Sequence, residues 1–204
     1  MIKNETKTGH HKSSLALFVM SALLSALMSG CATTKPADFV LAGFDSNSIN
    51  SIAVLPVLDH RIDQSQRLDL DAWVLPRAEG FLKKKGYSYT IERNRSLIAN
   101  ISRDDLASPS RDFIASLPPA SARWVLILVL DDSSSKLTFG STGNAEMSGY
   151  IFDKDKGKLT WRNKELGRVG QGGLIGMMMK GLMERSAIEQ ATIQMFQTLP
   201  DHKT

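Results

Sequence analysis

The order of the predicted elements indicates an α/β fold, in which a single domain carries a mixed β-sheet flanked by helices. Two short apolar runs, residues 52–58 and 124–130, have the composition of strands that are buried on both faces. A helical stretch separates these runs, and a hairpin pattern and a C-terminal helical pattern follow the second run. The predicted order is therefore strand, helix, strand, short helices, strand, hairpin and helix.

The first half of the domain is predicted from helix signals that follow strand 52–58. Pro76 suits the first turn of a helix, and Phe81 and Leu82 supply its apolar side. Three lysines favour the C-terminal end of the helix dipole, and Gly86 after them is a typical helix stop. Residues 87–91 then alternate between larger apolar and small polar side chains, which predicts a strand with one buried face.

Short helices are predicted in residues 102–117. Ser102 and Ser108 are the expected N-caps, because a serine side chain can accept a hydrogen bond from a free N–H group of the first turn. Pro109 suits a first helical position. These signals predict one or two short helices.

The strongest strand signal is the run at residues 124–130, which we expect at the centre of the sheet. The polar residues 130–135 at its end predict a loop. Residues 147–152 and 159–161 predict the two arms of a hairpin, with its turn at residues 154–157.

The C-terminal helix is predicted from a cap and from apolar spacing. Ser186 and Glu189 form the Ser-x-x-Glu pattern of a capping box, which places a helix start at this point. Pro200 ends the pattern. The apolar residues at helical spacing are Ile188, Ala191, Met195 and Leu199.

The N-terminal segment has the organisation of a secretory signal. Lysines precede an apolar stretch at residues 15–27, and small residues follow it. The stretch is shorter than the about 20 residues that a membrane span needs. We therefore expect residues 1–30 to be a signal peptide, residues 31–38 a short tether, and residues 39–200 the α/β periplasmic domain.

The stretch LMSGC, which ends at the single cysteine Cys31, resembles the lipobox of bacterial lipoproteins. Gly30 and Ser29 supply small residues before the cut, and Met28 stands where leucine is more usual. The resemblance implies cleavage between Gly30 and Cys31 and acylation of Cys31, and two or more acyl chains make a stable membrane anchor. Ala32 after the cysteine implies the outer membrane, with the domain facing the periplasm. The alternative is an ordinary secretory signal with an incidental cysteine.

Charge and cysteine content narrow the function classes. The chain carries 25 basic and 21 acidic residues, and three of the lysines lie in residues 1–30. The remaining domain is nearly balanced in charge and gives no argument for binding nucleic acid. A single cysteine cannot form an internal disulfide.

The sequence contains no convincing catalytic constellation, so we expect a non-enzymatic protein without a cofactor or a metal site. His60 follows the first predicted strand, between Asp59 and Arg61, at a position where open α/β sheets often bind ligands. His202 lies near the end of the chain, and no well-placed partner is available for a metal site. The alternative hypothesis is a periplasmic hydrolase with its site around His60, Asp59 and Asp131.

An apolar segment near the C-terminal end predicts a surface for contact with a partner protein. It lies between Gly172 and Lys180 and is too short to span a membrane. Methionine-rich surfaces adapt to varied partners. The alternative is a glycine-hinged turn whose methionines pack into the core. The candidate contact residues are Leu174, Ile175, Met177, Met178 and Met179.

Several segments resemble one group of bacterial lipoproteins, which includes CsgG, LpoB and small uncharacterised outer-membrane members. The small members are the most similar. The resemblance covers roughly residues 50–199 and implies a domain like the N-terminal domain of TolB, without enzyme activity. It also implies a protein that binds envelope proteins or helps to assemble them. The motifs that carry the resemblance are Leu55-Pro56, Gly86-Tyr87, and the trio Asp153, Gly157 and Trp161.

The same group implies self-association into homo-oligomers and an alternative function, a ring-forming secretion subunit of CsgG type. Such subunits insert hairpins whose arms are about 9–11 alternating residues long. Residues 136–150 alternate poorly and contain three glycines, which does not favour a pore. LpoB has a long linker, whereas residues 31–38 span at most about 25–30 Å. The sequence therefore favours an outer-membrane lipoprotein that binds an envelope protein close to its membrane.

Overall fold

One sheet of seven strands organises the described part of the chain. The computed structural model describes residues 39–40, 44–138, 140–173 and 180–202. The chain separates into two units, Met1–Pro36 and Ala37–Thr204, and the described residues belong to the second.

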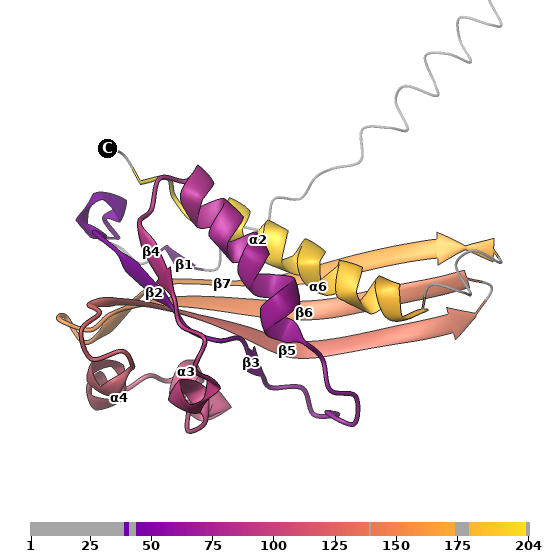
Figure 1. Ribbon diagram of the computed structural model, residues 1–204, viewed down its shortest axis with the longest axis horizontal. Helices are drawn as coiled ribbons and strands as arrows, with labels where there is room; N and C mark the ends of the chain where they lie inside the picture. Colours follow the sequence, from indigo (N-terminus) through magenta and orange to yellow (C-terminus); the bar gives the residue numbers. More distant parts are fainter. Residues whose placement is uncertain (1–38, 41–43, 139, 174–179, 203–204) are drawn as a thin grey trace, which may run out of the picture. The chain divides into compact units, whose positions relative to one another are not determined.

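The strand order is β1-β7-β6-β5-β2-β4, with β3 beside β5 (Figure 1). β2 lies between β4 and β5 and pairs with both in parallel, and β3 also runs parallel to β5. β5, β6 and β7 are long antiparallel neighbours, and β1 adds to β7 in antiparallel orientation. The strands are β1 (Phe39–Val40), β2 (Ile52–Val54), β3 (Leu58–Asp59), β4 (Tyr89–Ile91), β5 (Trp124–Thr138), β6 (Gly140–Asp153) and β7 (Lys158–Gly172).

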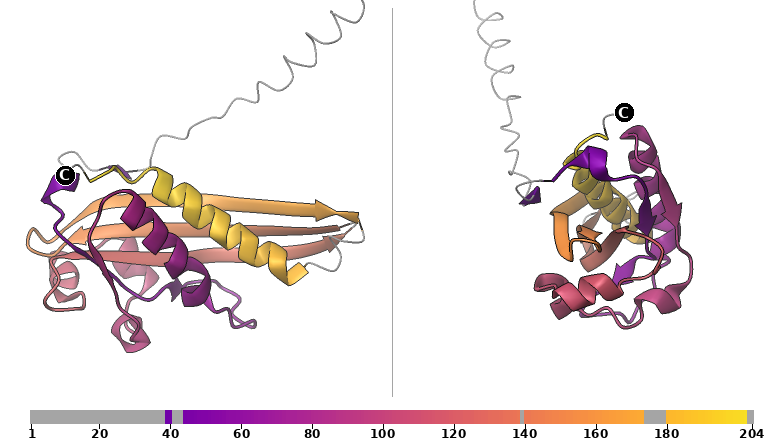
Figure 2. Two further views of the ribbon diagram at one scale, coloured as in Figure 1. Left: turned by 45° about the horizontal axis from the view of Figure 1, so that its top comes forward. Right: turned by 90° about the vertical axis from the view of Figure 1, so that its left-hand side faces the viewer.

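Helices cover both faces of the sheet where β2 meets β5. α2 and α6 pack together on one face, and α6 runs along the three long strands (Figure 2). α3 and α4 bury their apolar residues on the other face. This arrangement confirms the predicted α/β domain with a mixed sheet flanked by helices. The helices are α2 (Leu70–Lys84), α3 (Arg103–Ala107), α4 (Arg111–Ser116) and α6 (Lys180–Gln197), with short 3-10 helices η1 (Ser46–Ser48) and η2 (Arg95–Ile98).

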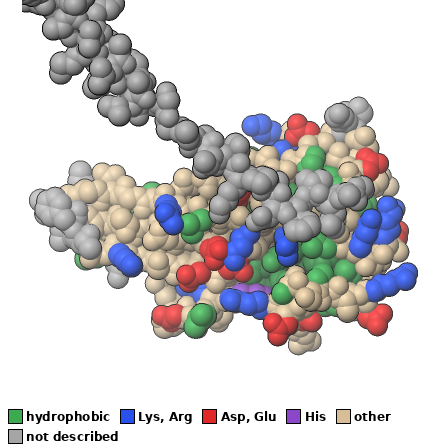
Figure 3. Space-filling view, turned by 180° about the vertical axis from the view of Figure 1, so that it is seen from behind, with side chains coloured by type: hydrophobic (Ala, Val, Ile, Leu, Met, Phe, Trp, Pro, Cys, Tyr) green, Lys and Arg blue, Asp and Glu red, His purple; other side chains and the backbone are tan. Residues whose placement is uncertain are grey.

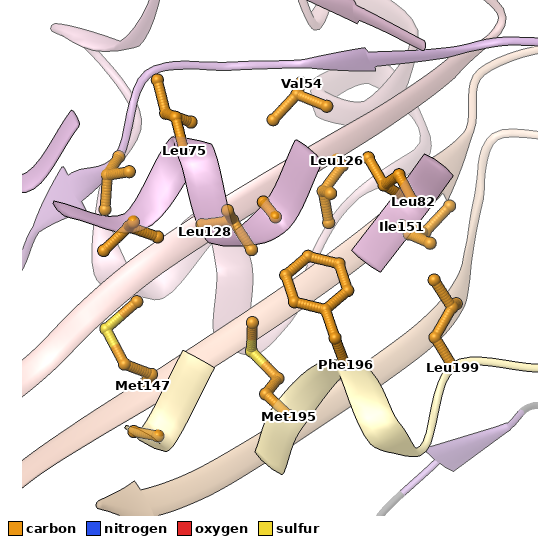
Figure 4. Close-up of a cluster of buried hydrophobic side chains, with 14 of the residues drawn as sticks. Val54, Leu75, Leu82, Leu126, Leu128, Met147, Ile151, Met195, Phe196 and Leu199 are labelled. Carbon is orange, nitrogen blue, oxygen red and sulfur yellow. The ribbon is translucent and has the colours of Figure 1, made fainter. Parts of the chain in front are cut away.

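Alternate residues of β5 divide the core into two clusters, because successive side chains of a strand point to opposite faces. Figure 4 shows the first cluster, in which Met195 and Phe196 of α6 approach the sheet. Burial on both faces explains the continuous apolar run and confirms the central position of this strand. The residues of β5 in the first cluster are Trp124, Leu126, Leu128 and Leu130, and those in the second are Val125, Ile127 and Val129.

The first apolar run is buried as predicted, but it is not one strand. Residues 52–58 are all buried, and Pro56 lies between β2 and β3. Proline has no N–H group to donate within a sheet, which explains the interruption.

Helix α2 begins at Leu70, so the prediction that Pro76 lies in the first turn is wrong. The side chain of Asp69 caps the helix by accepting a hydrogen bond from the N–H group of Ala72 at 3.3 Å. Pro76 removes one helical hydrogen bond, and the buried residues of α2, Val74 among them, keep the helix in place. The predicted stop is confirmed, because Gly86 has a φ of +83°, which favours glycine.

One of the two predicted caps of the short helices is correct. Ser102 caps α3 as predicted. Ser108 is instead the C-terminal cap of α3, and α4 is capped by Ser110, which accepts a hydrogen bond from the N–H group of Phe113 at 3.1 Å. Pro109 therefore precedes α4 and is not in its first turn.

The C-terminal helix starts earlier than its predicted capping box. Ser186 lies inside α6, so it is not an N-cap. Glu189 forms ion pairs with Arg77 of α2 and Arg185 of α6, both at 2.8 Å. The predicted apolar residues Ile188, Ala191, Met195 and Leu199 are all buried.

The polar loop predicted at residues 130–135 is wrong, because β5 continues to Thr138 and pairs with β6 along its length. The predicted hairpin turn at residues 154–157 is confirmed, and both of its arms are longer than predicted. Residues 131–138, 140–146 and 166–172 thus form a three-stranded ribbon, which we call the extension. Residues 166–172 alone span about 20 Å at the usual rise of a strand.

Glycines allow the backbone of α6 to lie directly on the extension. A Cβ atom at Gly143 would clash with the backbone carbonyl of Met183, and one at Gly167 with the carbonyl of Ala187. The hydroxyl of Ser133 donates a hydrogen bond of 2.6 Å to the carboxylate of Glu184, which is almost fully buried in α6. The close backbone approach at the two glycines and this hydrogen bond hold the extension against the helix.

A buried ion pair fixes the root of the β6–β7 hairpin. Asp153 is fully buried and accepts hydrogen bonds from the Nε and Nη2 atoms of Arg123 at 3.0 and 2.9 Å. Burial raises the pKa of Asp153, but the hydrogen bonds from Arg123 and from the N–H group of Lys156 outweigh burial and hold the pKa below its ordinary value.

We expect Gly167→Ala to lower the free energy of unfolding by about 1–3 kcal/mol, because the added methyl group meets helix backbone that cannot rotate away. Gly80→Ala is the matched control, since Gly80 is exposed on α2 and no heavy atom lies within 4 Å of its Cβ position. Alanine there should stabilise the helix by up to about 1 kcal/mol. Urea unfolding followed by circular dichroism measures both, and equal effects would contradict the proposed contact.

We expect stability to fall in acid through Asp153. Its ionised carboxylate contributes fully to the free energy of unfolding above about pH 4, the ordinary pKa of an aspartate. This contribution is lost as the pH falls through the lowered pKa of the folded state. Asp153→Asn should therefore be less stable than the unchanged protein at pH 7, and the gap should narrow toward pH 3. Urea titrations at both pH values measure it, and a gap that does not change would contradict this role.

Candidate functional site

The predicted site residues fall into two groups. Gly30, Cys31 and the predicted contact residues Leu174, Ile175, Met177, Met178 and Met179 lie outside the described residues. The histidine and carboxylates of the hydrolase hypothesis lie within them. No helix among the described residues combines the length and apolar character that crossing a membrane requires.

His60 and Asp59 are held by neighbours at the end of β3. The N–H group of His60 donates to the carbonyl of Leu130 at 2.9 Å, and its ring Nε2 lies 3.4 Å from the carbonyl oxygen of Ile101. The carboxylate of Asp59 accepts two hydrogen bonds from the buried Arg61, at 2.9 and 2.7 Å. The hydrogen bond of this imidazole therefore goes to a backbone carbonyl and not to a carboxylate.

Asp131 lies at an irregularity of β5, at the start of the extension. We call the rest of the domain the body. The register between β5 and β6 shifts at this residue, between Leu130 and Asp132, as it does at a β-bulge. The carboxylate of Asp131 accepts a hydrogen bond of 2.5 Å from the hydroxyl of Ser148. Arg103 donates to the backbone carbonyls of both His60 and Asp131. The structure therefore brings His60 and Asp131 to one place through the guanidinium of Arg103.

A lysine completes what we call the bulge cluster, namely Asp131, Glu146, Ser148 and Lys164. The Nζ atom of Lys164 lies 2.9 Å from Glu146 and 3.8 Å from Asp131. Partial burial lowers the pKa of Lys164, but the hydrogen bond to Glu146 and the attraction of Asp131 outweigh it, so the pKa lies above its ordinary value. Lys164 is therefore a cation that balances carboxylates at neutral pH.

The geometry of the bulge cluster suits a structural link. Ser148 is 1% exposed and donates its hydrogen to Asp131, so its oxygen is not presented to a substrate. Burial raises the pKa of the neighbouring Tyr150, which keeps its hydroxyl protonated. Among the described residues, no group of three or more His, Cys, Asp or Glu side chains is arranged to hold a metal ion.

A hollow of about 650 Å³ lies near the N-terminal end of α2. Its charged lining residues are Asp59, Arg67, Asp69, Asp71 and Arg95. Arg95 pairs with Asp71 at 2.6 Å, and Asp59 pairs with Arg61 at 2.7 Å. Asp71 and Arg95 in its wall therefore balance each other, and the charge of Asp59 is balanced by Arg61.

The extension is the feature that the sequence analysis missed. Beyond Arg162, β7 pairs only with β6 among the described residues, and β5 pairs only with β6 beyond Leu130. One face of the extension is covered by α6. Figure 3 views the molecule from behind, where the extension, at the left, is mostly tan and the charged side chains of both signs lie mainly over the rest of the domain. The signal in the sequence is weak, because Gly143, Ala145 and Gly167 place small residues on the face that α6 covers.

We expect Asp131→Ala to lower the free energy of unfolding by about 1–3 kcal/mol, because the buried hydroxyl of Ser148 loses its partner. Lys164→Met should lower the free energy of unfolding by less than about 1 kcal/mol, since the ion pair between Lys164 and Glu146 is half exposed. A double-mutant cycle with Ser148→Ala should show coupling between Asp131 and Ser148. A larger loss in Lys164→Met than in Asp131→Ala would argue against this link.

Comparison with known proteins yields similar structures but no family. No protein-family model and no curated protein matches the sequence. Lipoprotein GNA1162 from Neisseria meningitidis is 17% identical over 67% of this chain and 96% of that chain, with a TM-score of 0.42. The PelC dodecamer from Paraburkholderia phytofirmans is 13% identical over 76% and 89%, with a TM-score of 0.42. Protein XCC0632 from Xanthomonas campestris is 6% identical over 79% and 89%, with a TM-score of 0.46. Matches at these identities and TM-scores do not assign the chain to a family.

Proposed function

We propose that the protein is a non-enzymatic lipoprotein of the bacterial outer membrane, which faces the periplasm and binds another envelope protein through the extension. The observation that carries the proposal is the extension itself. Among the described residues, its two outer strand edges have no partner strand and its polar face has no covering helix, and α6 holds it in place at Gly143 and Gly167. A long ribbon of this kind adds little to the core, and open strand edges are sites where other chains pair.

The proposed anchor rests on the sequence around Cys31. The lipobox-like stretch ends at this residue, and Ala32 after it fits the outer membrane. Residues 31–38 can separate the domain from Cys31 by at most about 28 Å. A domain on so short a tether meets proteins of the same membrane far more often than distant ones, because tethering raises the effective concentration.

The hydrogen bonds of His60 and Ser148 favour a binding function over hydrolysis. The hydrogen bond of the His60 ring goes to the carbonyl of Ile101, and the hydroxyl of Ser148 donates to Asp131. A serine nucleophile needs an adjacent base that takes its proton, and the base is usually oriented by a third group. The described residues place no imidazole in that role.

The anchor predicts a lipid-modified N-terminus. The mature protein isolated from its native host should begin with an acylated Cys31, and Cys31→Ser should abolish the acylated N-terminal peptide. Met28→Leu is the matched control, because it supplies the usual lipobox residue and should leave acylation intact. Mass spectrometry of the N-terminal peptide measures each product, and an unmodified thiol in the unchanged protein would contradict the anchor.

The binding function predicts cross-links that depend on position. A photo-crosslinking amino acid at Thr142, exposed in the extension, should form a specific adduct with one envelope protein in living cells. The same amino acid at Ala72, exposed on α2, should not form that adduct. Mass spectrometry identifies the adduct, and a second copy of this chain in it would favour self-association. Identical adducts at both positions, or none at Thr142, would contradict binding through the extension.

A further inference from the structure

In the part of the chain that the structure describes, the outer edge of β7 has a partner strand over only two residues. β1 already pairs with this edge in antiparallel orientation at Trp161 and Arg162. Beyond Arg162 the described residues supply no further partner on this side of β7. The register of β7 with β6 stays regular from Trp161 to Gly172, and this stretch contains no proline. Two of the features with which proteins block a strand edge, a bulge and a proline, are therefore absent from residues 163–172, whereas Lys164 and Arg168 place charges on this edge.

The edge is also held rigid before anything binds. The side-chain amide of Asn163 donates to the carbonyl of Met195 at 3.1 Å and to the hydroxyl of Thr198 at 2.8 Å, both at the C-terminal end of α6 or just after it. Gly167 lies against the backbone of α6. A partner strand would therefore meet a backbone that is already ordered, which lowers the entropic cost of binding.

The side chains along this edge indicate the chemistry of the occupant. Asn163 and Gly167 face α6, so the alternate residues Lys164, Leu166 and Arg168 face the opposite side. Leu166 is 43% exposed between the two cations. Arg168 is exposed and has no ion pair among the described residues, whereas Lys164 pairs with Glu146 inside the same sheet. The unpaired positive charge of this row therefore lies at Arg168, near the apolar Leu166.

We propose that the edge of β7 at residues 163–172 binds an extended acidic segment of the partner protein as an antiparallel strand. The inference rests on the proposed function and names the kind of segment that the extension recognises. An acidic side chain of the segment lies opposite Arg168, and an apolar side chain lies opposite Leu166. Opposite charges that face each other across strands attract, and two identical basic edges repel each other, so a second copy of β7 is the poorer occupant.

The test uses the full lipoprotein in detergent and a fluorescent, acetylated probe peptide, Thr-Glu-Thr-Val-Thr-Glu-Thr. Fluorescence anisotropy measures its affinity, and hydrogen exchange measures protection of the β7 amides. We expect binding that protects amides within residues 164–170. Arg168→Glu should weaken binding about fivefold, and a peptide with lysine in place of glutamate should bind that variant better than the unchanged protein. Lys84→Glu on α2 is the matched control and should change neither affinity.

Three results would overturn the inference. The first is that the outward amides of β7 are already protected in the protein alone. The second is that the lysine peptide binds the unchanged protein as tightly as the glutamate peptide, and the third is peptide binding without protection of β7. If the cross-linked adduct at Thr142 still forms in any of these cases, the binding function stands and the β7 edge is not its recognition element.

Discussion

The contact between the backbone of α6 and the glycines of β6 and β7 is the interaction on which the extension depends. A ribbon of three strands with two open edges has little apolar surface of its own to bury, and it needs a helix to cover one face. Gly143 and Gly167 bring the carbonyls of Met183 and Ala187 against the sheet. This close approach replaces a layer of large side chains, so the extension is held without an apolar core of ordinary thickness.

The body contains the apolar core, and the extension presents a polar surface. In the body, β5 is buried on both faces and carries alternating side chains into two apolar clusters. At Asp131 the strand leaves this environment, and the bulge cluster supplies the paired charges and hydrogen bonds that a polar surface requires. The extension beyond it offers backbone edges and mixed charges to a partner. With Cys31 acylated as proposed, a short tether would keep this surface close to proteins of the same membrane.

The sequence predicts the body well because burial leaves a strong signal there. Apolar runs identify β5 and the buried residues 52–58, and Gly86 and Ser102 mark ends of helices through backbone conformation and hydrogen bonding. The extension leaves a weak signal, since its covered face is built from glycine, alanine and serine and its other face is polar. The start of α2 is missed because tertiary burial outweighs the local cost of Pro76. The sequence indicates His60 and Asp131 as candidate site residues. It does not predict their hydrogen-bond partners Ile101 and Ser148, because these are distant in the chain.

Native-state hydrogen exchange of the full lipoprotein tests the central claim most directly, because it asks whether the extension is a stable part of the fold. β6 is paired on both sides along the extension, so its inner amides exchange only when the sheet opens. We predict that amides of residues 141–146 are protected to nearly the same degree as those of residues 125–129 in the core. Exchange of residues 141–146 at the rate of an unstructured peptide would contradict it.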